Sequence, residues 1–283
     1  MKVFDALSQA ISFLEQTIPN PKREAEWLLS FLLRTDRSGI LAHYHDELDS
    51  SVVFDFFSLV RDRGNGKPLQ YILGMQEFRG LEFEVTTDVL IPRPETELVV
   101  GQVLGSFTGH PQGILIDCGT GSGCIAVSIA VESPEARLIA VDLSAAALKV
   151  ARRNARTHKV LDRIQFLAGD LLAPLSFYRI EGRIDCIVSN PPYVPEKDFT
   201  SLQREIREWE PKLALLAGSD GLAIYRRLIP QALAVLKKGG HLILEIGFSM
   251  KDSVSRLFQN GWHNVRVQED FSGIPRVVVA QKL

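Results

Sequence analysis

Several features that would indicate a particular partner or compartment are missing from this sequence. Its 283 residues include 32 lysines and arginines against 34 aspartates and glutamates, a formal net charge of only −2, so no global basic field indicates a nucleic-acid partner. No apolar run approaches the roughly 20 residues of a membrane-spanning helix. The N-terminus lacks the basic and apolar segments of a signal peptide. We therefore expect a cytoplasmic protein that contacts no membrane.

Cysteine and histidine are also scarce, and neither has the spacing of a known site. The three cysteines, Cys118, Cys124 and Cys186, form neither a CxxC pair nor a zinc pattern. Reduced cysteines that pack as small hydrophobic side chains are the simplest interpretation. The six histidines show no ligand spacing on one helix. The sequence therefore predicts no metal site.

The first third of the chain has the apolar spacing of short helices. We expect helices over residues 4–14, 24–33, 38–48 and 51–61. Each needs a partner for its apolar face, so residues 1–75 are predicted to form a small helical bundle. Residues 76–95 alternate apolar side chains with turn residues, which predicts a β-hairpin that links this domain to the next.

The remainder, residues 96–283, is predicted to be an α/β domain. The expected strands cover residues 114–117, 138–142, 164–167, 184–189, 241–246, 265–267 and 276–280. The expected helices cover residues 123–131, 144–158, 222–236 and 249–258, with Ser144 as an N-cap. Such alternation predicts a doubly wound, mostly parallel seven-stranded sheet. The last two strands have no helix between them, so one of them is expected to run antiparallel.

A glycine-rich loop follows the first expected strand and opens a helix. Its sequence is Asp117-Cys118-Gly119-Thr120-Gly121-Ser122-Gly123. Glycine lets the backbone turn tightly and approach a ligand closely. The even spacing is not the G-x-G-x-x-G of dinucleotide-binding proteins, and the lysine of a phosphate-binding loop is missing. We therefore expect a nucleoside ligand without a pyrophosphate.

A second acid, Asp142, ends the next expected strand and is followed by Leu143. A carboxylate at this point typically binds ribose hydroxyls. S-adenosylmethionine fits these features, with the glycine loop lining its methionine part and Asp142 accepting from its ribose. Asp170 and Leu171 follow the third strand and would flank adenine. A helix cap or turn is the alternative role for Asp170.

The most informative segment is Asn190-Pro191-Pro192-Tyr193, which follows the apolar strand 184–189. The prolines stiffen the loop at a strand end, where α/β proteins bind ligands. The Asn190 side-chain oxygen and the Pro191 carbonyl can accept both hydrogens of a planar amine. Tyr193 can stack on the same group. We interpret this loop as a clamp that aligns a nitrogen lone pair with the departing sulfur of the methyl donor.

The clamp alone does not identify its substrate, because a nucleobase amine and a side-chain amide present the same planar group. A non-catalytic nucleoside-binding module is a further alternative. The complete clamp beside a complete cofactor loop favours an enzyme.

Three further runs carry a more specific resemblance: QYILG at residues 70–74, VLIPRPETE at 89–97 and EPKLAL at 210–215. Together with the glycine loop, Asp142 and the Asn190–Tyr193 segment, they resemble the HemK/PrmC release factor glutamine methyltransferases. These belong to the class I S-adenosylmethionine-dependent methyltransferases, and the resemblance covers essentially the whole chain. An adenine or guanine methyltransferase has a similar clamp, but the near-neutral charge and the VLIPRPETE run argue against it.

The resemblance implies a class I methyltransferase sheet, a substrate-docking role for residues 1–75, and class I peptide release factors as protein substrates. The substrate side chain expected in the clamp is the glutamine of their Gly-Gly-Gln motif. It assigns residues 119–123, Asp142, Leu171 and Asn190 to the cofactor. Leu171 stands where some relatives have an aromatic residue, so an aliphatic contact with adenine is expected. We expect the loop over residues 91–97 to pack over the cofactor, with Arg93 or Glu97 making polar contacts; a structural proline-rich connector is the alternative role for this loop.

Overall fold

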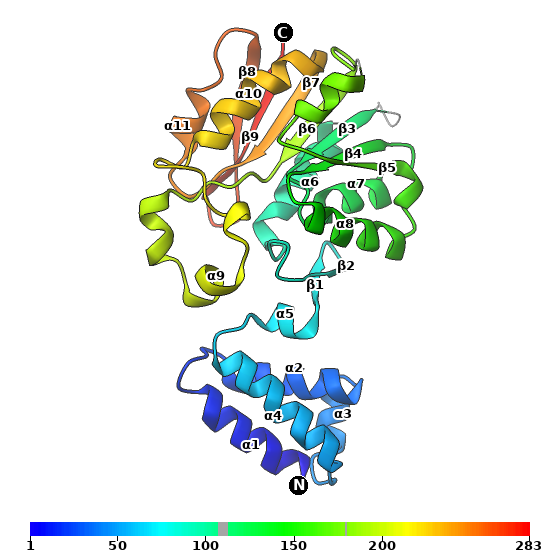
Figure 1. The fold of residues 1–283 in the computed structure, drawn as a ribbon, viewed down its shortest axis with the longest axis vertical. Coiled ribbons are helices and arrows are strands. Elements are labelled where there is room, and N and C mark those ends of the chain that lie inside the picture. The colour runs from blue at the N-terminus through cyan, green and yellow to red at the C-terminus, as the bar shows by residue number, and fades with distance from the viewer. Residues whose placement is uncertain (107–112, 179) are drawn as a thin grey trace. The chain divides into compact units, whose positions relative to one another are not determined.

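The computed structural model describes residues 1–106, 113–178 and 180–283 (Figure 1). They form two compact units. The first comprises Met1–Met75 with Gln203–Trp209, and the second comprises Gln76–Leu202 with Glu210–Leu283. Within the described part of the chain, no helix combines the length and apolar character that crossing a membrane requires.

The first unit is helical and has its own core. Its helices are α1 (Val3–Leu14), α2 (Pro21–Leu33), α3 (Arg37–Ala42), α4 (Ser50–Gly64), α5 (Leu69–Leu73) and the distant α9 (Arg204–Trp209). Side chains such as Leu14, Leu28 and Phe56 are fully buried between them. Arg63 of α4 pairs with Glu24 of α2 and lies 3.0 Å from Glu205 of α9. No sequence pattern indicated this association of residues 203–209.

Three helices of this unit have a boundary that differs from expectation by three residues or more. Helix α4 ends at Gly64 rather than residue 61. Helix α2 begins at Pro21 rather than residue 24, because proline fits the first turn, where its missing N–H is not needed. Helix α3 ends at Ala42, although the apolar spacing continues to residue 48. The chain beyond it pairs with the N-terminus instead, where Val3 N donates to Asp46 O at 3.0 Å and Leu48 N to Met1 O at 2.9 Å.

The expected hairpin is present, with strands β1 (Met75–Phe78) and β2 (Leu81–Glu84) forming a two-stranded sheet. The turn residues Arg79 and Gly80 both have positive φ, at 52° and 71°, the backbone of a tight two-residue hairpin turn. Phe78 and Phe83 are buried in the core of the second unit.

The second unit is built on the predicted mostly parallel, seven-stranded sheet (Figure 1). Its strands are β3 (Ile114–Cys118), β4 (Arg137–Asp142), β5 (Ile164–Ala168), β6 (Ile184–Ser189), β7 (Leu236–Glu245), β8 (Trp262–Glu269) and β9 (Pro275–Lys282). The order across the sheet is β5-β4-β3-β6-β7-β9-β8. Strand β9 runs antiparallel to both of its neighbours, β7 and β8, so the expectation that one of the last two strands is reversed is confirmed.

Helices cover both faces of this sheet, as the doubly wound prediction requires. One apolar cluster contains side chains of α6 (Glu97–Ser106), α7 (Cys124–Glu132) and α8 (Ala145–Thr157). The other contains side chains of α10 (Ala223–Val235) and α11 (Lys251–Ser255). Short 3-10 helices connect these elements at Pro94–Thr96, Leu161–Arg163, Ala173–Tyr178, Glu196–Ser201 and Lys212–Ala214. Helix α6 was not predicted.

One predicted boundary is wrong in an informative way. The helix expected over residues 222–236 ends at Val235, but the strand expected from residue 241 begins at Leu236, so Gly239 and Gly240 lie inside β7. The β6–β7 pairing shifts register between Ile184 and Cys186, opposite this point. A Cβ on Gly240 would lie 3.1 Å from Asp185 O. Glycine therefore permits a close backbone approach at a bulge. Helix α11 also ends early, at Ser255 rather than residue 258.

Candidate active site

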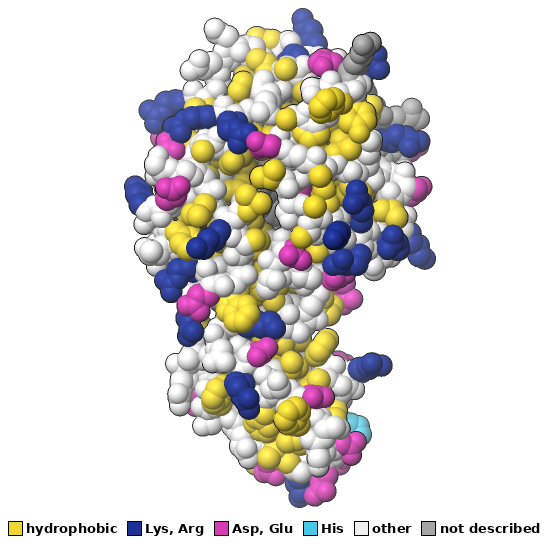
Figure 2. All heavy atoms as spheres, in the orientation of Figure 1, with side chains coloured by type: hydrophobic (Ala, Val, Ile, Leu, Met, Phe, Trp, Pro, Cys, Tyr) yellow, Lys and Arg dark blue, Asp and Glu magenta, His cyan; other side chains and the backbone are white. Residues whose placement is uncertain are grey.

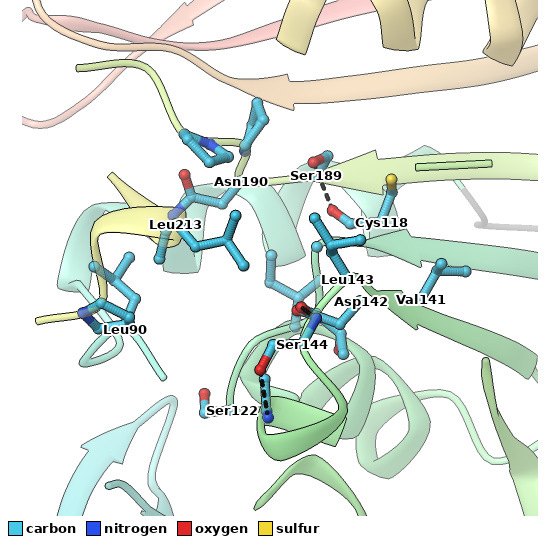
Figure 3. A pocket seen from close by; sticks show the side chains of 18 of the residues that line it. Leu90, Cys118, Ser122, Val141, Asp142, Leu143, Ser144, Ser189, Asn190 and Leu213 are labelled. Atoms are coloured by element: carbon cyan, nitrogen blue, oxygen red, sulfur yellow. Dashed lines mark hydrogen bonds between the residues drawn. The ribbon is translucent and has the colours of Figure 1, made fainter. Parts of the chain in front are cut away.

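A cavity opens in the second unit at the carboxyl ends of the parallel strands (Figure 3). Most of the predicted site residues line it, namely Gly119, Thr120, Ser122, Asp142, Leu143, Asp170, Leu171, Asn190, Pro191 and Pro192. Asp117, Gly121, Gly123 and Tyr193 do not belong to its lining. The two predicted groups, glycine loop and proline loop, therefore meet at one cavity although about 70 residues separate them in sequence.

Backbone hydrogen bonds hold the glycine loop against the end of β4. Gly119 N and Thr120 N both donate to Val141 O, at 2.8 and 3.0 Å. Gly119, Gly121 and Gly123 have positive φ values of 75°, 55° and 82°, which side chains disfavour. A Cβ on Gly123 would also lie 3.0 Å from Ala151 Cβ of α8. The last glycine thus lets the loop and helix α8 pack closely together.

Asp117 lies beneath this loop and is fully buried. Its Oδ2 accepts from Thr120 Oγ1 at 2.6 Å and from Ala126 N at 3.2 Å. Its Oδ1 is buried without a hydrogen-bond partner among the described residues. Burial raises the pKa of Asp117 to about 7. The acid of the glycine motif therefore fixes the loop to the start of α7, and one of its oxygens is left for a further donor.

Asp142 ends β4 and fixes the loop from the other side. Its Oδ2 accepts from Gly121 N at 2.8 Å, and its Oδ1 accepts from Ser144 N at 2.8 Å. Burial raises the pKa of this carboxyl group. Ser144 caps α8 as predicted, because its Oγ accepts from Ala147 N at 3.1 Å. Each carboxylate oxygen keeps a second lone pair that a ligand hydroxyl can use.

The end of β5 contributes Asp170 and Leu171 to the cavity. Asp170 forms an ion pair with Arg227 of α10, so it has a structural partner. Leu171 adopts a positive φ of 51°, which is uncommon for a side chain other than glycine or asparagine. Leu172 N donates to Gln231 Oε1 at 3.1 Å and holds the following turn to α10.

At the end of β6, Asn190 lies on the cavity with its amide nitrogen already engaged. Its Nδ2 donates to Thr96 Oγ1 at 3.1 Å. Thr96 Oγ1 in turn donates to Glu245 Oε2 at 2.6 Å, and both of these side chains are buried. Figure 3 shows Asn190 facing the same cavity as Leu143 and Asp142. The amide oxygen of Asn190 is thereby the group that remains to accept hydrogen bonds from a ligand.

Tyr193 follows the two prolines and is not among the residues that line the cavity. A Cβ on Gly247 would lie 2.8 Å from Tyr193 Cδ2, so the ring rests on the backbone after β7. Burial raises the pKa of Tyr193 to about 12, which keeps the phenol protonated at neutral pH. Its stacking on a substrate amine stays a prediction.

The residues that the sequence analysis missed come from distant segments. Thr96, Pro211, Leu213 and Ala214 line the cavity, and Glu245 supports Thr96 from beneath. Arg93 also lines the cavity and pairs with Glu210, which joins the VLIPRPETE and EPKLAL runs. Glu97, the alternative to Arg93, instead accepts from Arg79 N at 3.1 Å in the hairpin turn. Thr96 lies in the VLIPRPETE run and residues 211–214 lie in the EPKLAL run, and this membership was the signal that could have indicated them. Glu245 lies in neither run.

Comparison with known proteins places this site in a family. A family model described as the PrmC N-terminal domain matches residues 5–74, and one described as the methyltransferase small domain matches residues 99–209. A release factor glutamine methyltransferase of Geobacter sulfurreducens is 42% identical over 265 residues, which cover 93% of this chain and 90% of that protein. The chain belongs to the release factor glutamine methyltransferase family. The family resemblance expected from the sequence runs is therefore confirmed.

Other members of the family match over the full length. The release factor glutamine methyltransferase of Koribacter versatilis is 39% identical over 283 residues, 100% of this chain and 99% of that protein. Among solved structures, the hMettl16 catalytic domain in complex with the MAT2A 3'UTR hairpin 6 is similar with a TM-score of 0.54 and 16% identity. That match covers 82% of this chain and 81% of the solved chain. At this identity the likeness shows a shared methyltransferase fold.

Proposed function

We propose that this protein transfers the methyl group of S-adenosylmethionine to the side-chain amide nitrogen of the glutamine in the Gly-Gly-Gln motif of class I peptide release factors. The observation that carries the proposal is the orientation of Asn190, whose Nδ2 is held by Thr96 while its oxygen remains for a ligand amine. Family membership supports the choice of a release factor glutamine as that amine. Since its substrate acts in translation, we propose that the enzyme acts in the cytoplasm.

The residues around the cavity fit the methyl donor chemically. Asp142 offers carboxylate lone pairs for two ribose hydroxyls, and Leu143 and Leu171 offer apolar flanks for adenine. The buried Oδ1 of Asp117 lacks a partner among the described residues, which suits a nearby cationic or N–H donor. A Cβ at Gly119 or Gly121 would meet no described atom within 4 Å, so the glycine backbone is open to close approach. When bound, S-adenosylmethionine supplies a methyl group on a positively charged sulfur.

The protein's part in the reaction is to hold the amide nitrogen in line with that methyl group. A primary amide is a weak nucleophile because its lone pair is delocalised into the carbonyl. Acceptance of its two hydrogens by Asn190 Oδ1 and the Pro191 carbonyl reduces that delocalisation and stabilises the positive charge that develops on nitrogen. The prolines keep both acceptors fixed. We infer that the mechanism uses no metal ion, and that Tyr193 packs beside the amide.

We propose separate roles for the regions of the chain. Residues 1–75 would dock the release factor, residues 76–95 would serve as a linker, and residues 96–283 would carry out methyl transfer. The match of a named N-terminal family model to residues 5–74 supports a dedicated role for that segment.

The rival function, methylation of adenine or guanine in nucleic acid, has less support. On the face shown in Figure 2, hydrophobic and uncharged surface of the second unit separates groups of basic side chains. Two of the basic residues on and near α8 have partners within the protein. Arg153 pairs with Glu84 at 2.7 Å, and Arg163 Nη1 donates to Pro134 O at 3.1 Å. A phosphate-binding surface would instead present such side chains to a ligand.

One assay separates the two functions. The protein is incubated with methyl-labelled S-adenosylmethionine and, in parallel, with a release factor, its Gly-Gly-Gln to Gly-Gly-Ala variant, ribosomal RNA or DNA. We expect label in the release factor and none in the variant or the nucleic acids. Label in nucleic acid without label in the release factor would overturn the proposal.

A further inference from the structure

Asn190 is the end of a chain of hydrogen bonds that runs into the protein. The register of the sheet pairs Ser189 of β6 with Leu244 of β7, so Asn190 and Glu245 come next on neighbouring strands. Thr96, from the 3-10 helix Pro94–Thr96, lies between their side chains. Asn190 Nδ2 donates to Thr96 Oγ1 at 3.1 Å, and Thr96 Oγ1 donates to Glu245 Oε2 at 2.6 Å.

The direction of this chain follows from counting protons. An ionised carboxylate only accepts, so Glu245 takes the single hydroxyl proton of Thr96. Thr96 oxygen can then only accept from Asn190, which requires the NH₂ end of the amide. The Asn190 oxygen is consequently turned away from Thr96, and Asn190 is one of the residues that line the cavity. A protonated Glu245 could instead donate its proton to Thr96 Oγ1. The threonine hydroxyl could then donate to Asn190 Oδ1, which would let the amide group flip and exchange the positions of its oxygen and nitrogen.

We propose that Thr96 and Glu245 are positioning residues that set the direction of the Asn190 amide, so that its oxygen rather than its nitrogen meets the substrate amine. This inference rests on the proposed methyl transfer to a glutamine amide. An amide turned the other way would present two donors to a group that is itself a donor, which removes an acceptor and adds repulsion at the reacting nitrogen.

The surroundings of Glu245 make its ionisation sensitive to pH. Its side chain is 3% exposed. Burial raises its pKa to about 7, against the hydrogen bond from Thr96, which lowers it. The charged and titratable groups that face it are Glu95, which opposes ionisation, Arg276 and Arg93, which favour it, and the neutral Tyr193, Tyr225 and Cys124. Since the ionised form fixes Asn190, turnover should fall as pH drops through this pKa.

The first test compares two substitutions at Thr96. Thr96→Val keeps the shape of the side chain but removes the hydroxyl, whereas Thr96→Ser keeps the hydroxyl. We expect Thr96→Val to lower kcat on the release factor by at least about tenfold, and Thr96→Ser to retain most of the turnover. S-adenosylmethionine affinity, measured for both variants, should stay near that of the unmodified protein. The melting temperature of Thr96→Val should fall, because Glu245 and Asn190 lose a buried partner, so turnover is compared at a temperature where both variants are folded. Equal turnover of the two variants would overturn the inference.

The second test follows kcat/KM against pH in the unmodified protein and in Glu245→Gln, because this ratio reports ionisations of the free enzyme. The amide of glutamine cannot titrate, and it can present either its oxygen or its nitrogen to Thr96. We expect an acid limb near neutral pH in the unmodified protein, and lower, flatter activity in the variant. A limb unchanged in Glu245→Gln would assign the ionisation to another group, such as Asp117, and overturn the role of Glu245.

These results also separate this inference from the proposed function. If the unmodified protein transfers no methyl group to release factor, both the proposed function and the positioning role are overturned. Transfer by the unmodified protein, with equal turnover of the two Thr96 variants, would remove only the positioning role.

Discussion

The two sides of the cavity are held in different ways. On the side that we assign to the cofactor, called the cofactor side below, at the ends of β3 and β4, backbone amides bind to Val141 O and to the carboxylate of Asp142, and three glycines adopt positive φ. On the amine side, at the end of β6, the side chain of Asn190 is oriented by other side chains, first Thr96 and then Glu245. One side is shaped by the backbone and the other by a chain of side-chain hydrogen bonds.

This difference predicts how each side responds to substitution. The backbone-held side should fail mainly in ligand affinity and stability, because its geometry depends on local conformation. The side-chain-held side should fail mainly in turnover, because a change of one amide leaves the cavity intact but removes acceptors from the reacting nitrogen.

The largest expected effect is that of Asn190→Ala. It removes the acceptor that we assign to the substrate amine, so kcat should fall by about 10²–10³-fold, while S-adenosylmethionine affinity is largely kept. Isothermal titration and label transfer measure the two quantities on the same preparation. Asn260→Ala, at an exposed asparagine, is the control. Near-normal turnover of Asn190→Ala would end the assignment of the clamp.

Asp142→Ala should show the opposite distribution of effects. It removes a carboxylate that tethers Gly121 N and that we assign to the ribose, so S-adenosylmethionine affinity should weaken by about 10–100-fold. Titration calorimetry of this variant against Asp162→Ala, which removes an exposed carboxylate, measures the difference. An affinity unchanged in Asp142→Ala would remove the proposed ribose contact.

The backbone of the cofactor side is tested by Gly123→Ala. The new Cβ would require a positive φ of 82° and approach Ala151 Cβ to 3.0 Å, so the free energy of unfolding should fall by about 1–3 kcal/mol. Gly101→Ala in helix α6, where a Cβ meets no described atom within 4 Å, should leave it unchanged or raise it by up to about 1 kcal/mol. Urea unfolding measures both. Equal stabilities would contradict a loop fixed by its backbone.

The last comparison concerns two neighbours on α8 that both contact β2, and it includes the smallest expected effect, that of Arg153→Ala. Buried Asn154 accepts from Glu84 N at 2.7 Å and donates to Ser122 O at 2.8 Å, so Asn154→Ala should cost about 1–3 kcal/mol of stability. Arg153, with its exposed pair to Glu84, should cost less than about 1 kcal/mol on substitution by alanine. Thermal unfolding of the two alanine variants measures the loss of stability in each. A larger loss for Arg153→Ala would show that surface charge, not the buried amide, holds the hairpin to the loop.

The same contrast explains what the sequence could predict. The seven strands, the reversed β9 and the Ser144 cap follow from apolar periodicity and a local capping pattern. The glycine loop and Asp142 were also found, because each lies in a short motif directly after a strand. Local patterns suffice where the backbone itself shapes the structure.

Local patterns do not suffice where partners are distant in sequence. Thr96 and Asn190 are 94 residues apart, and nothing near Glu245 marks it as more than the end of a buried strand. The start of β7, predicted at residue 241 and observed at Leu236, was misplaced for the same reason, since Gly240 meets Asp185 O of the neighbouring strand there. The association of α9 with the first unit likewise depends on Arg63 and Glu205.

The most direct test of the central claim is to locate the transferred methyl group. Release factor is incubated with this protein and S-adenosylmethionine, digested, and analysed by tandem mass spectrometry. We predict a single methyl group on the side-chain nitrogen of the Gly-Gly-Gln glutamine, present with the unmodified protein and lost with Asn190→Ala. A methyl group on any other residue, or equal modification by Asn190→Ala, would contradict the account.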